Sequence, residues 1–188
     1  MARFAGIILA GGESRRFGSP KAFAKRNGIP FYHYSINALT PFCSSVILVT
    51  RPELHDQFKK EEEVLIRVIN DEEKYKGKGP IAGIYSAMKE VTADWYFVLP
   101  IDVPFIEQWV LEELKNNLDS NVEAVVPVVA GKQQPLIAIY SHSVKNKIVD
   151  KLSNDKRSLR HLFETIHVKY VKMEKEAPFR NINRTEDL

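Results

Sequence analysis

The sequence has few of the residues that build covalent cross-links, metal cages or membrane spans. Its one cysteine, Cys43, excludes an intramolecular disulfide and a thiolate metal cage, and it favours a reducing compartment. No apolar run approaches the roughly 18 residues that a membrane helix needs. The N-terminus also lacks the long apolar stretch of a secretory signal peptide. We therefore expect a cytoplasmic protein with no membrane partner.

A strong charge of one sign is also missing. The net charge of +3 is too small to favour a nucleic-acid partner bound by bulk charge. None of the five histidines pairs with another ligand at metal-binding spacing, so we interpret them as structural or surface residues. The basic residues still cluster near the N-terminus and at residues 145–160, and two positive patches suit two small anions as well as one polymer.

Apolar runs alternate with helix-like segments along the chain, and the hydrophobic content of 44% is ample for a core. Strands are predicted at residues 4–9, 46–50, 64–69, 95–99, 122–129 and 136–140. Helices are predicted at residues 31–39, 53–62, 81–90, 106–118 and 144–152. This alternation predicts the α/β class, a Rossmann-like three-layer sandwich with a mostly parallel sheet. In such folds ligands bind beyond the carboxyl ends of the strands.

The clearest motif begins in the first predicted strand. Residues 6–21 read GIILAGGESRRFGSPK, so an apolar strand ends in a small-residue loop that carries Arg15, Arg16 and Lys21. Glycine lets backbone amides approach a ligand, and guanidinium and ammonium groups suit phosphate oxygens. The loop is neither a Walker A motif nor the dinucleotide pattern G-x-G-x-x-G. It predicts a nucleoside triphosphate site of another kind; the alternative is a surface turn with incidental charges.

A second motif, WYFVLPIDVP at residues 95–104, brings Asp102 to the end of an apolar strand. Pro100 and Pro104 flank the acid and stop the strand. A carboxylate on the same sheet edge as the phosphate loop is a natural Mg²⁺ ligand, because Mg²⁺ often binds one or two carboxylates together with substrate phosphates. The alternative is that Asp102 caps a helix that begins near residues 104–105, and the two roles do not exclude one another.

Two weaker signals lie between these motifs. Asp71 follows the strand predicted at residues 64–69, where it would contact a base or ribose, or else be a solvated loop charge. The glycines of residues 77–83 precede a helix. They either let a ligand approach closely or form an ordinary flexible loop.

Three further segments lie in the C-terminal part of the chain. Residues 131–135 are interpreted most simply as a hairpin turn. The polar residues 153–160 either bind a second phosphate or cap a short helix. Asn181 and Asn183, two positions apart, share one side of an extended segment, but alone they indicate little.

Taken together, these motifs resemble those of the molybdenum cofactor guanylyltransferase family. The matching segments are Leu9-Ala-Gly-Gly-x-Ser-Arg-Arg-x-Gly-x-x-Lys21, Gly79-Pro-Ile-Ala-Gly83, Pro100-x-Asp-x-Pro104 and Asn181-Ile-Asn183 with Glu186-Asp-Leu188. They occur in the family's order over nearly the whole chain. The first motif alone is shared with many nucleotidyltransferases, whereas the combination is much more specific.

The resemblance implies transfer of GMP from GTP to the terminal phosphate of molybdenum-molybdopterin, on a fold of the nucleotide-diphospho-sugar transferase type. One domain, residues 1–188, would bind nucleotide with its N-terminal part and pterin with its C-terminal part. Mg²⁺ would be the cofactor on Asp102, with Arg15, Arg16 and Lys21 on the triphosphate. Further implied nucleotide contacts are Leu9, Ala10, Gly11, Gly12, Asp71 and Gly83. Implied pterin contacts are Gln134, Pro135, Arg157, Asn181 and Asn183.

The resemblance also implies transient contact with proteins that make or receive the cofactor. Where relatives often have an asparagine after the second strand, this chain has Thr50-Arg51. The alternatives are a related nucleotidyltransferase that uses CTP or a sugar phosphate, and a non-catalytic nucleotide- or cofactor-binding module. Gly11 favours GTP, because relatives that transfer CMP commonly read Leu-Ala-Ala-Gly. The presence of Lys21 and Asp102 argues against a non-catalytic module.

Overall fold

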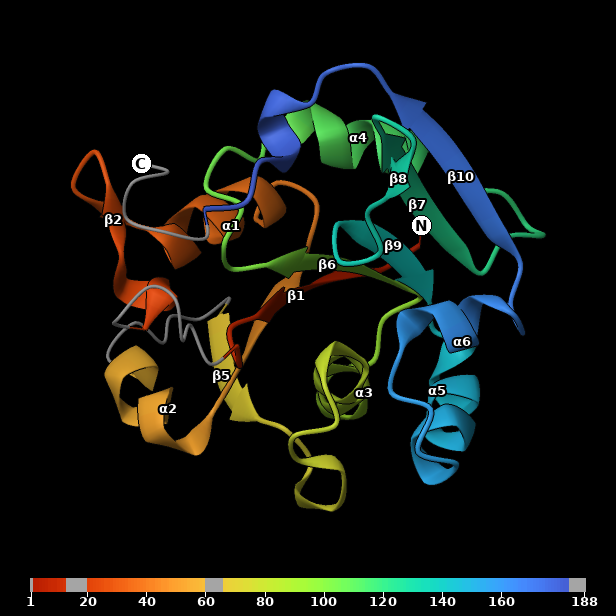
Figure 1. Ribbon diagram of the computed structural model, residues 1–188, viewed down its shortest axis with the longest axis horizontal. Helices are drawn as coiled ribbons and strands as arrows, with labels where there is room; N and C mark the ends of the chain where they lie inside the picture. The colour runs from red at the N-terminus through yellow and green to blue at the C-terminus, as the bar shows by residue number, and fades with distance from the viewer. Residues whose placement is uncertain (1, 13–19, 60–65, 183–188) are drawn as a thin grey trace.

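The computed structural model describes residues 2–12, 20–59 and 66–182, which form a central sheet between two layers of helices (Figure 1). The strands lie in the order β10-β7-β9-β6-β1-β4-β5, and β8 pairs with β7 beside this path. The strands are β1 (Phe4–Leu9), β4 (Ser45–Thr50), β5 (Ile66–Asn70), β6 (Trp95–Pro100), β7 (Ala124–Val129), β8 (Lys132–Gln133), β9 (Ala138–Ser141) and β10 (Val168–Met173). A separate hairpin consists of β2 (Lys25–Arg26) and β3 (Ile29–Pro30).

The middle of the sheet is parallel, as the alternation of elements predicts. β1 runs parallel to both β4 and β6, and β4 runs parallel to β5. β9 is the exception, because it is antiparallel to both β6 and β7, while β10 lies parallel to β7. The carboxyl ends of β1, β4, β5 and β6 therefore share one edge, where ligands of α/β proteins bind.

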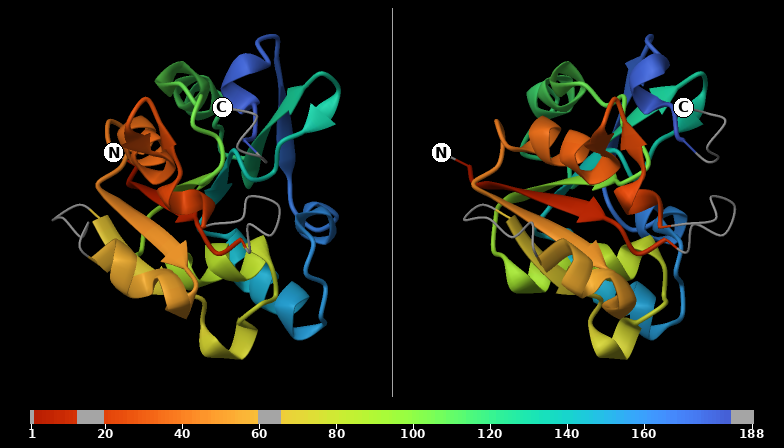
Figure 2. Two further views of the ribbon diagram at one scale, coloured as in Figure 1. Left: turned by 60° about the vertical axis from the view of Figure 1, so that its left-hand side comes forward. Right: turned by 90° about the vertical axis from the view of Figure 1, so that its left-hand side faces the viewer.

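Each face of the sheet is covered by its own group of helices. One hydrophobic cluster joins side chains of α1 (Phe31–Leu39), α2 (Pro52–Lys59) and α4 (Gln108–Asn116) to Ile8, Leu48 and Phe97 of the sheet. The other joins α3 (Pro80–Glu90), α5 (Val144–Ser153) and α6 (Leu159–Phe163) to Ile7, Ile47 and Val98. Neighbouring strand residues thus serve opposite faces, as the two-residue period requires. Figure 2 shows the sheet between α1 and α4 on one side and α3 and α5 on the other.

One predicted helix starts later than expected, and this changes the interpretation of Asp102. The helix predicted over 106–118 is observed as α4, which begins at Gln108. Before it, the Ile106 amide donates to the Val103 carbonyl at 3.1 Å, and both side chains are buried. Burial of these apolar residues holds the segment in turns. The alternative that Asp102 caps a helix beginning near residues 104–105 is therefore wrong.

The other differences concern the ends of elements. α2 begins at Pro52 and is described to Lys59, and β5 is described from Ile66, so parts of the predicted segments 53–62 and 64–69 lie outside the described residues. β7 and β9 each begin two positions later than predicted. The last part of the chain adds α6, β10 and a 3-10 turn, Ala177–Phe179.

The chain makes two tight hairpins, one within the main sheet and one apart from it. Asn27 and Gly28 turn β2 into β3 with φ values of 51° and 79°. Ala130 and Gly131 turn β7 into β8 with φ values of 47° and 77°, so the predicted hairpin is present, but its turn lies at residues 130–131 and Lys132–Gln133 form β8. Such left-handed pairs match the twist of the flanking strands. Across the described part of the chain, no helix is long and apolar enough to cross a bilayer.

Candidate active site

The ends of the parallel strands gather residues from separate parts of the sequence. Leu9, the last residue of β1, lies opposite Pro100 of β6, and Thr50 of β4 lies opposite Asn70 of β5. The chain therefore leaves these four strands at the same edge of the sheet. The residues that follow these ends and that the sequence assigns to the site are Ala10, Asp71 and Asp102.

The lysine and the acid singled out by the two strongest motifs are in contact. Lys21 begins a 3-10 turn, Lys21–Phe23, and its Nζ lies 3.3 Å from Oδ2 of Asp102. Their side chains are 11% and 24% exposed, so the pair is mostly shielded from water. The ammonium shows that the Asp102 carboxylate can receive a cation at this strand end. Arg15 and Arg16 lie outside the described residues.

The C-terminal segment lies against the Asp102 loop. The Ile182 amide donates to the Asp102 carbonyl at 2.9 Å, which places the neighbouring Asn181 beside this loop. The guanidinium carbons of Arg26 and Arg180 lie 4.4 and 4.3 Å from the centre of the Phe105 ring. Cation–π contacts of this kind tie the β2–β3 hairpin and the chain end to the segment after Asp102. Asn183 falls outside the described residues.

Gly83 lets α3 approach the strand ends closely. A Cβ at this position would lie 2.8 Å from Cδ2 of Leu9 and 3.5 Å from Oδ1 of Asp71. Leu9, Asp71 and Gly83 are therefore neighbours, although they come from three elements. Asp71 is half-buried, and burial raises the pKa of its carboxyl, while a hydrogen bond from the Gly77 amide opposes this shift.

The two glycines of the first motif leave open space beside the backbone. Among the described residues, a Cβ on Gly11 would have only Cγ of Arg51 nearby, at 4.0 Å, and one on Gly12 would have nothing within 4 Å. Neither glycine has a positive φ. At this edge the two glycines therefore leave the backbone accessible to a ligand, and they are not required by an unusual backbone conformation.

Sequence reasoning leaves Thr50 and Arg51 without a role. Oγ1 of Thr50 and Nε of Arg51 are buried and have no hydrogen-bond partner among the described residues. Arg51 also approaches Gly11, as its Cγ position shows. The signal that points to them is the departure from the family's usual asparagine. Buried polar groups are normally satisfied, so these two are candidates for contact with a bound ligand.

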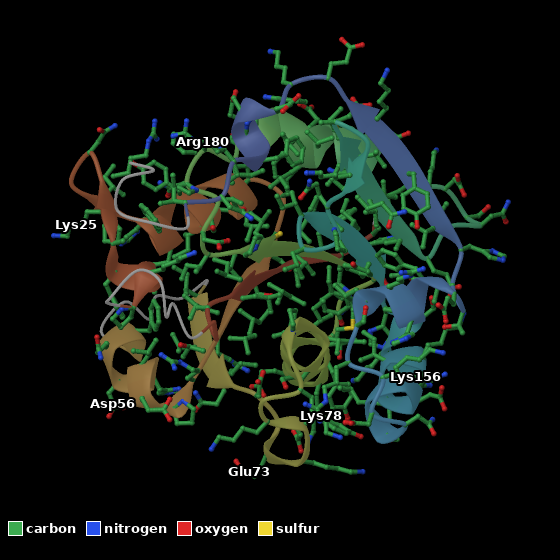
Figure 3. The ribbon with its side chains drawn as sticks, in the orientation of Figure 1. Lys25, Asp56, Glu73, Lys78, Lys156 and Arg180 are labelled. Carbon is green, nitrogen blue, oxygen red and sulfur yellow. The ribbon has the colours of Figure 1, made fainter. Side chains whose placement is uncertain are left out.

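The loop before α3 connects the strand ends with the C-terminal half of the molecule. Gly79, with φ of 79°, is the N-cap of α3, and Pro80 is the first helical residue. Nζ of Lys78 lies 3.2 Å from the Leu152 carbonyl and 3.4 Å from Oδ1 of Asp155. Figure 3 shows Lys78 between this loop and the end of α5. The loop therefore joins the two halves through side-chain contacts.

Asp155 also holds Arg157. Nε and Nη2 of Arg157 donate to the two carboxylate oxygens at 3.0 and 3.2 Å. Hydrogen bonds from Arg157 and Lys78 lower the pKa of the Asp155 carboxyl. Residues 154–158 thus form a polar loop that carries these ion pairs, and Ser158 at its end is the N-cap of the short helix α6, accepting a hydrogen bond from the Arg160 amide.

A groove of about 820 Å³ opens beside this loop. It brings together Pro135 and Arg157, two of the residues assigned to the second substrate. Gln134 is not among the lining residues; its backbone N–H donates to the Pro127 carbonyl within the hairpin. The groove is lined by Pro80, Gln133, Pro135, Leu136, Arg157, Ser158, Leu159, Arg160, Phe163, Glu164 and Tyr170.

Metal binding by the protein alone is not supported in the described ranges. No group of three or more histidine, cysteine, aspartate or glutamate side chains there is placed to hold a metal ion. Asp102 offers a hard oxygen ligand and already receives the Lys21 ammonium, so a hard cation fits if substrate oxygens complete its shell.

A parallel-sheet edge of this kind is the general ligand position of α/β folds, and comparison with known proteins assigns this one to a nucleotidyltransferase. Residues 6–172 match the MobA-like NTP transferase domain, and the chain belongs to this family. It is 39% identical over 187 residues to a "Probable molybdenum cofactor guanylyltransferase" from Geobacillus sp. (strain WCH70), with 97% of this chain and 95% of the relative covered. A protein of the same name from Bacillus anthracis (strain CDC 684 / NRRL 3495) is 38% identical over 195 residues, with 100% and 94% covered.

A solved structure has the same architecture. The crystal structure of molybdopterin-guanine dinucleotide biosynthesis protein A from Archaeoglobus fulgidus superimposes with a TM-score of 0.80 at 26% identity, covering 97% of this chain and 94% of that one. The predicted fold, of the nucleotide-diphospho-sugar transferase type, is confirmed. The family resemblance drawn from the motifs is confirmed as well.

Proposed function

We propose that this protein transfers GMP from GTP to the terminal phosphate of molybdenum-molybdopterin. An oxygen of the acceptor phosphate forms a bond to the α-phosphorus of GTP. The bond from that phosphorus to the bridging oxygen of the β-phosphate breaks, and pyrophosphate leaves. The observation that carries the proposal is the Lys21–Asp102 pair at the strand edge, in a chain whose relatives are named for this reaction.

The proposed catalytic residues act by positioning and by neutralising charge. Asp102 would hold Mg²⁺, which when bound neutralises triphosphate charge and stabilises the departing pyrophosphate. Lys21, now on the Asp102 carboxylate, would turn to the triphosphate together with Arg15 and Arg16. The acceptor is already an anion, so no general base is needed, and orientation supplies much of the rate.

Nucleotide binding is assigned to the strand edge. Leu9 and Ala10 end β1, and the open backbone of Gly11 and Gly12 would meet the nucleotide. Asp71 and Gly83, which adjoin Leu9, complete the nucleotide contacts in this proposal.

Acceptor binding is assigned to the other half of the molecule. Pro135 and Arg157 share the groove, with Gln134 supporting the hairpin behind Pro135. Asn181 stands beside the Asp102 loop, and Asn183 would follow it. The acceptor would thus reach from the groove to the metal site. Transient protein partners in the cytoplasm would deliver the acceptor and receive the product.

The direct test offers GTP and CTP together with molybdopterin and Mg²⁺ in one reaction. We expect guanine dinucleotide and pyrophosphate in strong excess over the cytosine product, because a site built to hydrogen-bond one base leaves its polar groups unpaired with another. Equal use of the two nucleotides, or a preference for CTP, would contradict the guanylyltransferase assignment. Binding of GTP without pyrophosphate release would instead indicate a non-catalytic module.

A further inference from the structure

An aromatic side chain stands exposed inside the groove. Tyr170 of β10 is 45% exposed, and among the described residues Ile29, at 42%, is the other exposed large hydrophobic side chain. Ile29 lies in the β2–β3 hairpin, whereas Tyr170 lines the concave groove. Contact between the apolar surface of a ring and water is unfavourable, so an exposed ring in a concave groove marks a surface that a ligand can cover. The position of Tyr170 therefore points to a ligand.

The ring of Tyr170 packs against a second aromatic ring. Phe163 of α6 also lines the groove, and its ring meets that of Tyr170 edge to face, with centroids 6.5 Å apart at 77°. Behind it, Phe163 stacks on Tyr140 at 6.4 Å and 25°. Tyr140 is fully buried, and its hydroxyl donates to the Pro135 carbonyl at 2.6 Å. The aromatic wall, Tyr170 and Phe163, is thus fixed to the core and to the hairpin.

Cationic groups lie along the same groove. Arg157, which also pairs with Asp155, and Arg160 both line it, so the lining has two cations against one acid, Glu164. Pro80 places the N-terminal end of the 11-residue helix α3 there as well. Helix N-termini and guanidinium groups both favour anions. A flat apolar wall combined with these groups suits a planar heteroaromatic ring that carries an anionic group.

The groove also lies next to the strand edge. Gly83 follows Pro80 by three residues of the same helix, roughly 4.5 Å along its axis. Gly83 adjoins Leu9 and Asp71, which belong to the proposed nucleotide site. A ligand on the aromatic wall can therefore extend its anionic end toward the nucleotide.

We infer that Tyr170, supported by Phe163, is the surface on which the planar ring system of the acceptor stacks. The inference rests on the proposed function for the identity of that ring, the pterin. It assigns the acceptor's apolar contact to the edge strand β10. Arg157 and Arg160 would then face its anionic part.

The test compares Tyr170→Ala with Tyr170→Phe, and uses Ile29→Ala as a matched control at the other exposed hydrophobic residue. Loss of the ring should raise the KM for molybdopterin about 5- to 150-fold, the range of base–aromatic stacking. The KM for GTP should stay unchanged. Tyr170→Phe keeps the ring and should behave like the unaltered protein, as should Ile29→Ala. Binding of pterin-6-carboxylate, followed by its own fluorescence, gives a readout independent of turnover.

Each other outcome has a definite meaning. An unchanged molybdopterin KM and pterin binding in Tyr170→Ala would overturn the inference, as would an equal rise in the GTP KM. A loss in Tyr170→Phe as large as in Tyr170→Ala would overturn it too, because the hydroxyl rather than the ring would be responsible. If the unaltered protein binds the pterin through Tyr170 but transfers no GMP, the stacking surface stands and the proposed function fails.

Discussion

The two halves of the sheet differ in how they are built. β1, β4, β5 and β6 form a parallel block whose carboxyl ends carry the proposed nucleotide site. β7, β9 and β10 form a mixed block, in which β9 reverses direction, and the groove lies beside it. The first half repeats a strand–helix unit, whereas the second combines the β7–β8 hairpin, the polar loop before α6 and the edge strand β10. In the proposed function the regular half binds the nucleotide, and the irregular half binds the acceptor.

Asp102→Asn should have the largest effect, because it removes the residue on which both halves depend. Asparagine keeps the volume of the side chain but is a poor Mg²⁺ ligand. Metal stabilisation of the transition state is worth several kcal/mol, so we expect transfer to fall by at least about a thousandfold. Turnover at saturating GTP and Mg²⁺ measures this, with the melting temperature as the check on folding. Normal turnover of Asp102→Asn would show that Asp102 is not the Mg²⁺ ligand.

Lys21→Met should weaken the nucleotide half alone. Loss of a charged hydrogen bond to phosphate costs about 1.5–3 kcal/mol, so calorimetry should show GTP affinity reduced at least about tenfold. The exposed Lys25 serves as the matched control, and Lys25→Met should bind GTP normally.

The same variant separates the two partners of Lys21. Removing the ammonium leaves the Asp102 carboxylate without the cation it now holds at 3.3 Å. Asp102 alone is an incomplete metal site, so Mn²⁺ should bind the nucleotide-free protein weakly in both cases, but more tightly in Lys21→Met than in the unaltered protein. Intact GTP affinity together with unchanged Mn²⁺ binding would contradict the assigned role of the pair.

Gly79→Ala should weaken the junction between the halves. Gly79 has φ of 79° and ψ of −170°, a region that is essentially restricted to glycine and costs other residues about 1–3 kcal/mol. We expect denaturant unfolding to show a loss of stability of that order. Gly11→Ala is the contrasting variant, since Gly11 has no positive φ and, within the described ranges, its Cβ would meet only Arg51. Gly11→Ala should keep its free energy of unfolding and lose activity with GTP. A loss of stability in Gly11→Ala without one in Gly79→Ala would contradict the roles assigned to both glycines.

The sequence predicts the regular half well and the irregular half poorly, for physical reasons. The strands of the parallel block are buried on both faces, so their uniform apolar runs are visible without any partner. The contact between Lys21 and Asp102 follows from strand ends sharing one edge. The groove could not be foreseen in the same way, because Pro135, Arg157 and Tyr170 meet only through strand pairing between distant segments.

Local signals explain the remaining successes and failures. Asn27-Gly28 is a standard hairpin signal that could have identified β2 and β3. The apolar Ile106 reads as helical by spacing, yet its burial in a turn delays α4 to Gln108. The roles of Arg15, Arg16 and Asn183 stay predictions, since these residues lie outside the described part of the chain.

Asp155→Asn should have the smallest effect, and it tests whether the polar loop matters for the acceptor alone. Asp155 receives both Arg157 and Lys78, and these cations lower its pKa, but all three side chains face solvent to a considerable degree. Exposed ion pairs contribute little, so stability should barely change. Without its carboxylate partner, Arg157 samples more orientations, and we expect the KM for molybdopterin to rise by less than about fivefold. The KM for GTP should not move, because Leu9, Gly11 and Lys21 are untouched. A larger rise in the GTP KM than in the acceptor KM would show that the loop before α3, which Lys78 ties to Asp155, serves the nucleotide half instead.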